Sequence, residues 1–346
     1  MTPPASSSFA ASPVTTTTTP TPWRRDWEAV SGLRTPARRT CRCTFPSSGR
    51  DLTVNLRTYH FSDGARERLR ISALNWSPLT TAIKDRQFHD DDQIRRPLLN
   101  GRIKTQLMND GLSDAVLFLG GYQPVMRQGV IAGICAFLEG DFKNGRCDAS
   151  WRSRAPVAFI SESLGSYMLF DAIRHMEGTP QSNATSAAVS NLLAQVRVVY
   201  MFANQIPLLE LAEPNRPPAG AGAPLAARAF PAKTTFGAFL DLLRQARAPK
   251  LRAAARPSPA AQPAAPPPPV EFVAFTDPND ILSYQVRPSD FPSSGDQTFT
   301  APANVLSPNE VAWFDLVADP VSAHNGYSDN SQVIELVVCG TVGCAK

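Results

Sequence analysis

Almost continuous runs of apolar residues occur at 156–160, 196–203 and 270–277, separated by stretches with helical spacing. Because these runs are rich in β-branched and aromatic residues, they are predicted to be strands buried on both faces of a sheet. The stretches 52–61 and 69–80 alternate apolar with polar residues, which predicts two further strands nearer the N-terminus. Strands that alternate with helices indicate an α/β fold, with a mostly parallel central sheet flanked by helices.

Helices are predicted where apolar residues recur every three or four positions. This spacing occurs in 124–138 and again from Gly165 to about His175. Towards the C-terminus, 310–319 is predicted to be the last strand, and 328–339 a closing helix with Ser or Asp available as its N-cap.

Composition separates three regions of the chain. Residues 1–22 carry almost no bulky apolar side chains and cannot offset the entropy of ordering, so we expect 1–50 to be a largely disordered N-terminal region. The remainder, 51–346, is predicted to be one domain. The connection 204–269 between two buried strands far exceeds the usual few residues, and it contains an amphipathic helix at 234–247 between Ala/Pro-rich tracts. We expect this insertion to be a cap or linker segment.

The five residues SESLG, 161–165, lie between the strand predicted at 156–160 and the helix that follows it. In the nucleophile elbow, G-x-S-x-G, a serine on a strained turn needs small residues two positions before and after it, so that strand and helix can approach. Ser161 replaces the first glycine here, but it is small enough for this packing. The alternative role for such a serine is a helix N-cap; the flanking strand and long helix favour the elbow, with Ser163 as nucleophile.

A serine nucleophile needs a base, and the chain has four histidines. His175 follows Ser163 on the same predicted helix and, at about 1.5 Å per residue, lies roughly 18 Å away. His89 stands in a polar stretch, HDDD, typical of a solvated turn, and His60 ends an early strand, where a structural role is expected. His324, in a loop between the last predicted strand and the last helix, is therefore the expected base.

The base needs an acid to orient it, and two aspartates follow the strand at 270–277, in FTDPNDILSY. Asp277 is at the strand terminus, where an Asp before Pro often starts a turn. Asp280 lies three residues further along and has room to turn toward a neighbouring loop. Both remain candidates, and we prefer Asp280.

Ser163, Asp280 and His324 occur in the chain order of the α/β-hydrolase triad, each after a predicted strand. From about Leu52 to Gly340 the chain resembles the α/β-hydrolase superfamily of serine esterases and lipases. AFISESLGSYMLFDAI resembles the nucleophile strand and elbow, FTDPNDILSY the acid loop, and SAHNGYSDNSQVIELVVCG the histidine loop and last helix.

The resemblance also implies an oxyanion hole and a cap. The N–H of Leu164, directly after the nucleophile, is the expected first donor. Most members supply another donor from a His-Gly or Gly-rich turn; this chain has no His-Gly, and Gly120–Gly121 and Asn75–Leu79 are the candidates. The insertion 204–269 falls where such enzymes carry a cap, and the apolar residues of its helix suit an apolar acyl chain.

Charge and hydropathy exclude several other classes. The net charge is +4 and the basic residues are scattered, so nucleic-acid binding is not expected. There is no run of eighteen apolar residues and no recognisable secretory signal, so we expect no transmembrane segment and a cytoplasmic location.

The six cysteines do not form a recognisable framework. The C-x-C at Cys41 and Cys43 and the C-x4-C at Cys339 and Cys344 lack the further ligands of a zinc site. We therefore expect plain thiols, and neither a metal nor another cofactor.

These observations predict a serine hydrolase that cleaves a small-molecule or lipid-like carboxylic ester through an acyl-enzyme. The alternative is a non-catalytic protein of the same fold, in which a Pro-rich segment such as PSPAAQPAAPPPP, 257–269, recruits partners. The sequence does not specify the acyl length or the oligomeric state.

Overall fold

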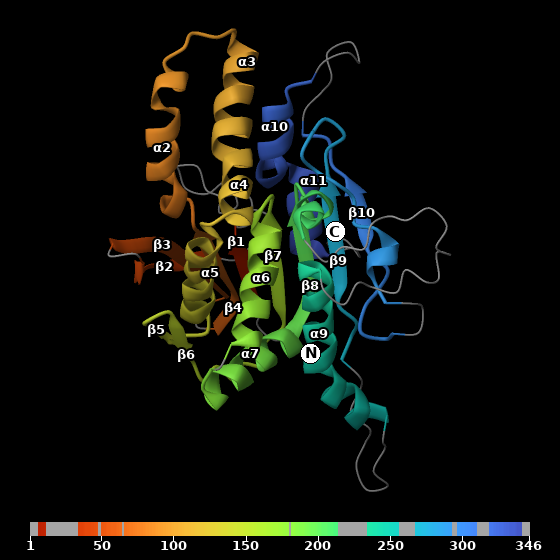
Figure 1. The fold of residues 1–346 in the computed structure, drawn as a ribbon. Helices are drawn as coiled ribbons and strands as arrows, with labels where there is room; N and C mark the ends of the chain where they lie inside the picture. The colour runs from red at the N-terminus through yellow and green to blue at the C-terminus, as the bar shows by residue number, and fades with distance from the viewer. Residues whose placement is uncertain are drawn as a thin grey trace, which may run out of the picture.

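The structure is a computed structural model, and it describes residues 6–11, 34–47, 50–63, 66–179, 181–213, 234–255, 267–292, 296–309 and 318–340. Its main sheet has the strand order β10-β9-β8-β7-β1-β4-β3-β2 (Figure 1). The strands are β1 (Ser6–Ala11), β2 (Arg34–Ser47), β3 (Arg50–Asp63), β4 (Arg66–Asn75), β7 (Val157–Glu162), β8 (Val196–Phe202), β9 (Glu271–Thr276) and β10 (Ala303–Leu306). Strands β7 to β10 pair in parallel, β1 is parallel to both β4 and β7, and β2, β3 and β4 are antiparallel. The expected α/β class with a mostly parallel sheet is confirmed.

Helices cover both faces of this sheet. One face carries α5 (Gln123–Phe137), α6 (Gly165–Gly178), α7 (Asn183–Gln195) and α9 (Thr235–Ala255). The other carries η5 (Tyr327–Asp329) and α11 (Ser331–Cys339), which follow α10 (Pro320–Asn325). The short helices α8 (Ile206–Leu209) and η2 (Glu210–Ala212) follow β8, and η4 (Pro288–Asp290) precedes β10.

Alternate residues of the parallel strands enter two separate apolar cores. Phe159 of β7 and Met201 of β8 pack on the side of α6, whereas Ile160 and Phe202 pack on the side of α11. Because successive side chains of a strand point to opposite faces, a sheet covered on both faces needs continuously apolar strands. This explains the three apolar runs that predicted β7, β8 and β9.

Within 1–50, which the sequence predicts to be largely disordered, the structure describes two strands. Ser6–Ala11 forms β1, in the middle of the sheet between β4 and β7, and Arg34–Ser47 forms β2 at its edge. The ordering of β1 comes from main-chain hydrogen bonds to two neighbouring strands, which composition does not reveal. Residues 1–5 and 12–33 lie outside the described residues.

The helix expected in a cap is instead part of the body of the domain. α9 packs against α6 and α7 on the same face of the sheet, between β8 and β9 in chain order. Its Phe239 is fully buried and stacks on Phe170 of α6, with ring centroids 4.1 Å apart. The apolar stripe therefore serves the core, as is usual for the helix of a parallel crossover. Residues 214–233 and 256–266 of the expected insertion lie outside the described residues.

The last strand lies earlier in the chain than its predicted position. β10 is Ala303–Leu306 and pairs in parallel with β9, whereas 310–317 of the predicted strand lies outside the described residues. The four residues of β10 are half-exposed or exposed, so no continuous apolar run marks them. The closing helix predicted at 328–339 is present as α11, which begins at Ser331. The expected Ser or Asp cap is wrong, because the N-cap is Asn330, whose side chain accepts from the N–H groups of Gln332 and Val333.

A helical hairpin lies beyond the ends of the strands, at the upper left of Figure 1. It consists of α2 (Pro78–Asp92), α3 (Leu98–Arg102), the π-helix η1 (Ile103–Leu112) and α4 (Ser113–Leu119). Lys84 of α2 and Asp114 of α4 form a buried ion pair at 3.1 Å, which ties its two arms together. Among the described residues, no helix combines the length and apolar character that crossing a membrane requires.

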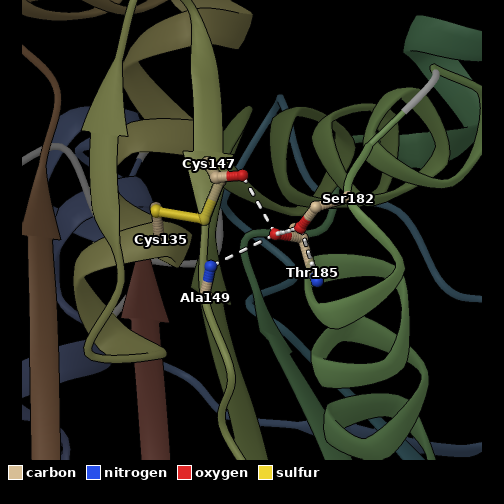
Figure 2. Close-up of a disulfide and its surroundings, with 5 residues drawn as sticks. All are labelled: Cys135, Cys147, Ala149, Ser182 and Thr185. Carbon is tan, nitrogen blue, oxygen red and sulfur yellow. Dashed lines mark hydrogen bonds between the residues drawn. A yellow bond between two sulfur atoms is a disulfide. The ribbon is translucent and has the colours of Figure 1, made fainter.

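A disulfide joins Cys135 at the end of α5 to Cys147 in β6 (Arg146–Asp148) (Figure 2). Cys339 is also disulfide-bonded. The expectation of plain thiols is therefore wrong for these three residues. β6 pairs with β5 (Asp141–Lys143) in a small hairpin that folds back against α5, and this brings the two Cα atoms to 5.6 Å. A contact between a helix end and a hairpin has no fixed cysteine spacing, so the sequence did not reveal it.

The disulfide hairpin is also fixed to α7 (Figure 2). The Thr185 hydroxyl donates to the carbonyl of Cys147 at 3.0 Å and accepts from the N–H of Ala149 at 3.1 Å. Ser182, the N-cap of α7, accepts from the N–H of Thr185. The disulfide attaches the β5–β6 hairpin to α5, and the hydrogen bonds of Thr185 attach it to α7.

We expect Cys135→Ala/Cys147→Ala to lower the free energy of unfolding by about 3 kcal/mol. The disulfide closes a loop and so restricts the conformations of the unfolded chain, and the double variant loses this restriction. Urea denaturation of the oxidised wild type and the double variant measures this difference. Coincident urea transitions would contradict the expected contribution.

Candidate active site

Ser163 lies in a tight turn between β7 and α6. It has φ +54°, in the left-handed region, and its N–H donates to the carbonyl of Phe202 at 2.8 Å. This places the backbone of the turn against the end of the neighbouring strand β8. A non-glycine residue with such a φ is uncommon and is typical of a strand–turn–helix elbow that projects one side chain from the edge of the sheet.

Ser161, two residues earlier, has a different role. Its side chain is fully buried, and its hydroxyl lies 2.7 Å from that of Ser166 in the first turn of α6 and donates to the carbonyl of Tyr200 at 3.2 Å. The hydroxyl thus joins β7, β8 and α6 where a glycine would leave no contact. Neither Ser161 nor Ser163 is the N-cap of α6, because that position belongs to Leu164.

The structure brings Ser163, His324 and Asp280 together in one hydrogen-bonded chain. His324 Nε2 lies 3.1 Å from Ser163 Oγ, and His324 Nδ1 lies 2.9 and 3.0 Å from the two carboxylate oxygens of Asp280. The exposed fractions of the three residues are between 4% and 7%. Because an ionised carboxylate only accepts hydrogen bonds, the proton lies on Nδ1, and Nε2 of the neutral imidazole is free to accept from the serine.

Asp277 does not reach the imidazole. Its carboxylate accepts hydrogen bonds from the N–H groups of Asn279 and Asn309, so it fixes the turn after β9 to the segment after β10. Of the two aspartates, the structure therefore brings Asp280 to His324 and gives Asp277 a local structural role.

The other three histidines have different surroundings. His60 contacts Glu67 on the neighbouring strand β4, and His89 is exposed in the last turn of α2. His175 lies in the last turn of α6, and burial and the nearby Arg127 lower its pKa.

Leu164, the expected oxyanion donor, immediately precedes α6. The N–H groups at a helix N-terminus have no partner within the helix, and its dipole favours negative charge there. In the candidate stretch Asn75–Leu79, the N–H groups of Ser77 and Leu79 already have acceptors and Pro78 has no N–H.

Candidate groups for a second oxyanion donor remain at Trp76 and at Gly120–Gly121. The indole N–H of Trp76 is buried and has no hydrogen-bond partner within the described part of the chain. Ala11 of β1 pairs with Leu74 of β4 on one side and with Ser161 of β7 on the other. Trp76 and Ser163 each come two residues later, so they follow their strands at the same level of the sheet. Gly120 and Gly121 lie in the exposed turn between α4 and α5.

Two further residues support the site without a clear mark in the sequence. Tyr327 hydrogen-bonds to Asp280, and only its place three residues after His324 in HNGY marked it. Arg102 of α3 bonds to Asp319 and to the Ser322 hydroxyl, and so links the hairpin to the helix that carries His324. No sequence signal connects positions so far apart.

Metal-ligating groups do not gather at this site. Within the described residues, no three His, Cys, Asp or Glu side chains are arranged to hold a metal ion. The chemistry available is that of the hydroxyl, the imidazole, the carboxylate and the helix N-terminus.

No protein-family model, no curated protein and no solved structure matches this chain. The hydrogen-bonded chain of Ser163, His324 and Asp280 is thus the feature on which a functional assignment has to rest.

Proposed function

We propose that this protein is a serine hydrolase that cleaves carboxylic esters through an acyl-enzyme. The observation that carries the proposal is the unbroken chain Ser163 Oγ, His324 Nε2, His324 Nδ1 and Asp280, with each step at hydrogen-bond distance. A nucleophile beside a base, and a base oriented by an acid, is the arrangement that activates a hydroxyl. The left-handed turn at Ser163 supports the same role.

The geometry suggests the following reaction. Ser163 Oγ attacks the ester carbonyl while its proton passes to His324 Nε2, and Asp280 stabilises the imidazolium that forms. The tetrahedral oxyanion accepts from the Leu164 N–H at the N-terminus of α6. His324 then protonates the leaving alcohol, and the ester bond to Ser163 is later hydrolysed by a water whose proton His324 takes.

The proposal extends to an α/β-hydrolase fold. The three residues follow β7, β9 and β10 in the order Ser, Asp, His, which supports it. The segment best placed to cover the site is the hairpin from α2 to α4, since Arg102 binds beside His324, rather than the insertion 204–269.

The apolar residues of α9 are buried in the core, so they cannot contact a substrate and do not support a lipid-like ester. Ile281, directly after Asp280, is 64% exposed, and Tyr284 of the same loop is 39% exposed. These apolar surfaces near the triad favour an ester with an apolar part. No observation on the described residues favours the alternative role of the Pro-rich segment, most of which lies outside them.

The disulfides also bear on location. A buried bond between Cys135 and Cys147, together with the bonded Cys339, favours folding in an oxidising compartment over the cytoplasm expected from the sequence.

Labelling with a fluorophosphonate tests the proposed function. We expect the folded wild-type protein to form a covalent adduct at Ser163, located by peptide mass spectrometry, and to hydrolyse p-nitrophenyl acetate. Heat-unfolded protein should not be labelled, because reactivity depends on the assembled triad. Failure of the folded protein in both assays would reject the assignment.

A further inference from the structure

Tyr327 contacts Asp280, the acid of the site. It is fully buried in η5, and its ring stacks on Phe202, with centroids 6.3 Å apart and planes 8° apart. Its hydroxyl lies 3.0 Å from Asp280 Oδ2 and 2.7 Å from the main-chain nitrogen of Asp277. The side chain therefore joins the end of β9 to the loop that carries Asp280.

The direction of these two hydrogen bonds follows from the groups involved. The N–H of Asp277 can only donate, so the Tyr327 oxygen accepts from it. The carboxylate of Asp280, which accepts from His324 Nδ1, can accept from Tyr327 as well, so the hydroxyl proton points to Oδ2. Burial, followed by the charge of Asp280, raises the pKa of Tyr327, so the hydroxyl keeps its proton.

We propose that Tyr327 is a positioning residue that holds Asp280 against His324 and limits how strongly this carboxylate attracts the imidazole proton. The inference rests on the proposed function of the triad. Asp280 Oδ1 accepts from the N–H of Leu282 at 2.9 Å, and Oδ2 from Tyr327. With one donor on each oxygen, the carboxylate cannot rotate away, and both oxygens stay near Nδ1.

Asp277, whose N–H donates to Tyr327, has other partners for its carboxylate. This carboxylate accepts from the main-chain N–H groups of Asn279 and Asn309. The hydroxyl of Tyr327 is thus the contact through which the packing of η5 reaches Asp280. Its loss would concentrate the carboxylate charge on the bond to His324.

The test compares Tyr327→Phe with Tyr200→Phe. Both changes remove a buried hydroxyl from the same apolar core, but the Tyr200 hydroxyl contacts the carbonyl of Leu336, not the triad. For Tyr327→Phe we expect kcat/KM for p-nitrophenyl acetate to fall about 10-fold. The acidic limb of its pH profile should move up by roughly 0.5 pH unit, because the imidazolium is held more strongly. Tyr200→Phe should leave the limb in place.

A spectroscopic readout separates this inference from the proposed function. The low-field proton NMR signal of the His324 Nδ1–H···Asp280 bond should move further downfield in Tyr327→Phe and remain unchanged in Tyr200→Phe, whether or not the protein is active. An inactive wild type would reject the proposed function but leave this comparison valid. An unmoved signal and an unmoved acidic limb in folded Tyr327→Phe would overturn the inference.

Should Tyr327→Phe fail to fold, site-specific replacement of Tyr327 by 3-fluorotyrosine provides a second test. The fluorinated phenol keeps the ring and is a stronger donor. The acidic limb and the low-field signal are then expected to move in the opposite direction, and an absence of movement would equally overturn the inference.

Discussion

Ser163→Ala is expected to lower kcat for ester hydrolysis by roughly four to six powers of ten, because the nucleophile is lost and the triad acts as a unit. The fold should remain, since the side chain removed is small and its hydroxyl contacts only His324 among the hydrogen bonds described. Rates on p-nitrophenyl acetate, together with thermal unfolding, measure both quantities. The variant should also resist fluorophosphonate labelling.

Ser161→Ala is the matched control for this result. It also removes a serine hydroxyl, two residues away from Ser163. The Ser161 hydroxyl, however, bonds to Ser166 and to the carbonyl of Tyr200 within the core. We expect a loss of about 1 kcal/mol in the free energy of unfolding and a kcat close to wild type. Equal losses of activity in the two variants, or an active Ser163→Ala, would remove Ser163 from the mechanism.

Asp280→Asn is expected to lower kcat by about four powers of ten while the protein stays folded. The amide that replaces the carboxylate carries no charge to stabilise the imidazolium. Its NH2 group also favours the wrong tautomer of His324, with the proton on Nε2, where it cannot accept from Ser163. Steady-state kinetics near the pH optimum measures this loss.

Asp277→Asn supplies the comparison, because it makes the same chemical change three residues earlier. The Asp277 carboxylate accepts from the N–H groups of Asn279 and Asn309, and an amide can replace only one of these acceptors. We expect about 1–3 kcal/mol less stability and a kcat within roughly 10-fold of wild type. A larger loss of kcat in Asp277→Asn than in Asp280→Asn would reverse the two roles.

Features encoded locally were predictable from the sequence. The three apolar runs gave β7, β8 and β9 because strands buried on both faces have to be apolar throughout. The turn at Ser163 was predictable because strand, small residues and helix follow one another without interruption. His324 emerged by elimination, since the chain has only four histidines.

Features that depend on distant parts of the chain were not predictable. β1 is a strand because β4 and β7 flank it, and its own residues give no such signal. The amphipathic stripe of α9 is the same whether it faces a core or a substrate, so the sequence could not place it. Likewise, Cys135 and Cys147 pair only because a hairpin returns to the end of α5.

Within the candidate site, the grouping of Ser163, His324 and Asp280 was predictable and the residues that support it were not. Tyr327 hydrogen-bonds to Asp280, and Arg102 bonds to Asp319 and Ser322 at the start of α10. None of these contacts has a sequence pattern. A triad needs particular residue types, whereas its supports need only a donor in the right place.

The left-handed backbone at Ser163 favours different residues for stability of the fold and for the proposed reaction. A left-handed conformation costs an L-residue roughly 1–2 kcal/mol, and glycine adopts it without this strain. Selection for folding alone would therefore drive position 163 toward glycine, which has no hydroxyl. On the proposed function, a lineage that gave up catalysis would gain stability by this one substitution.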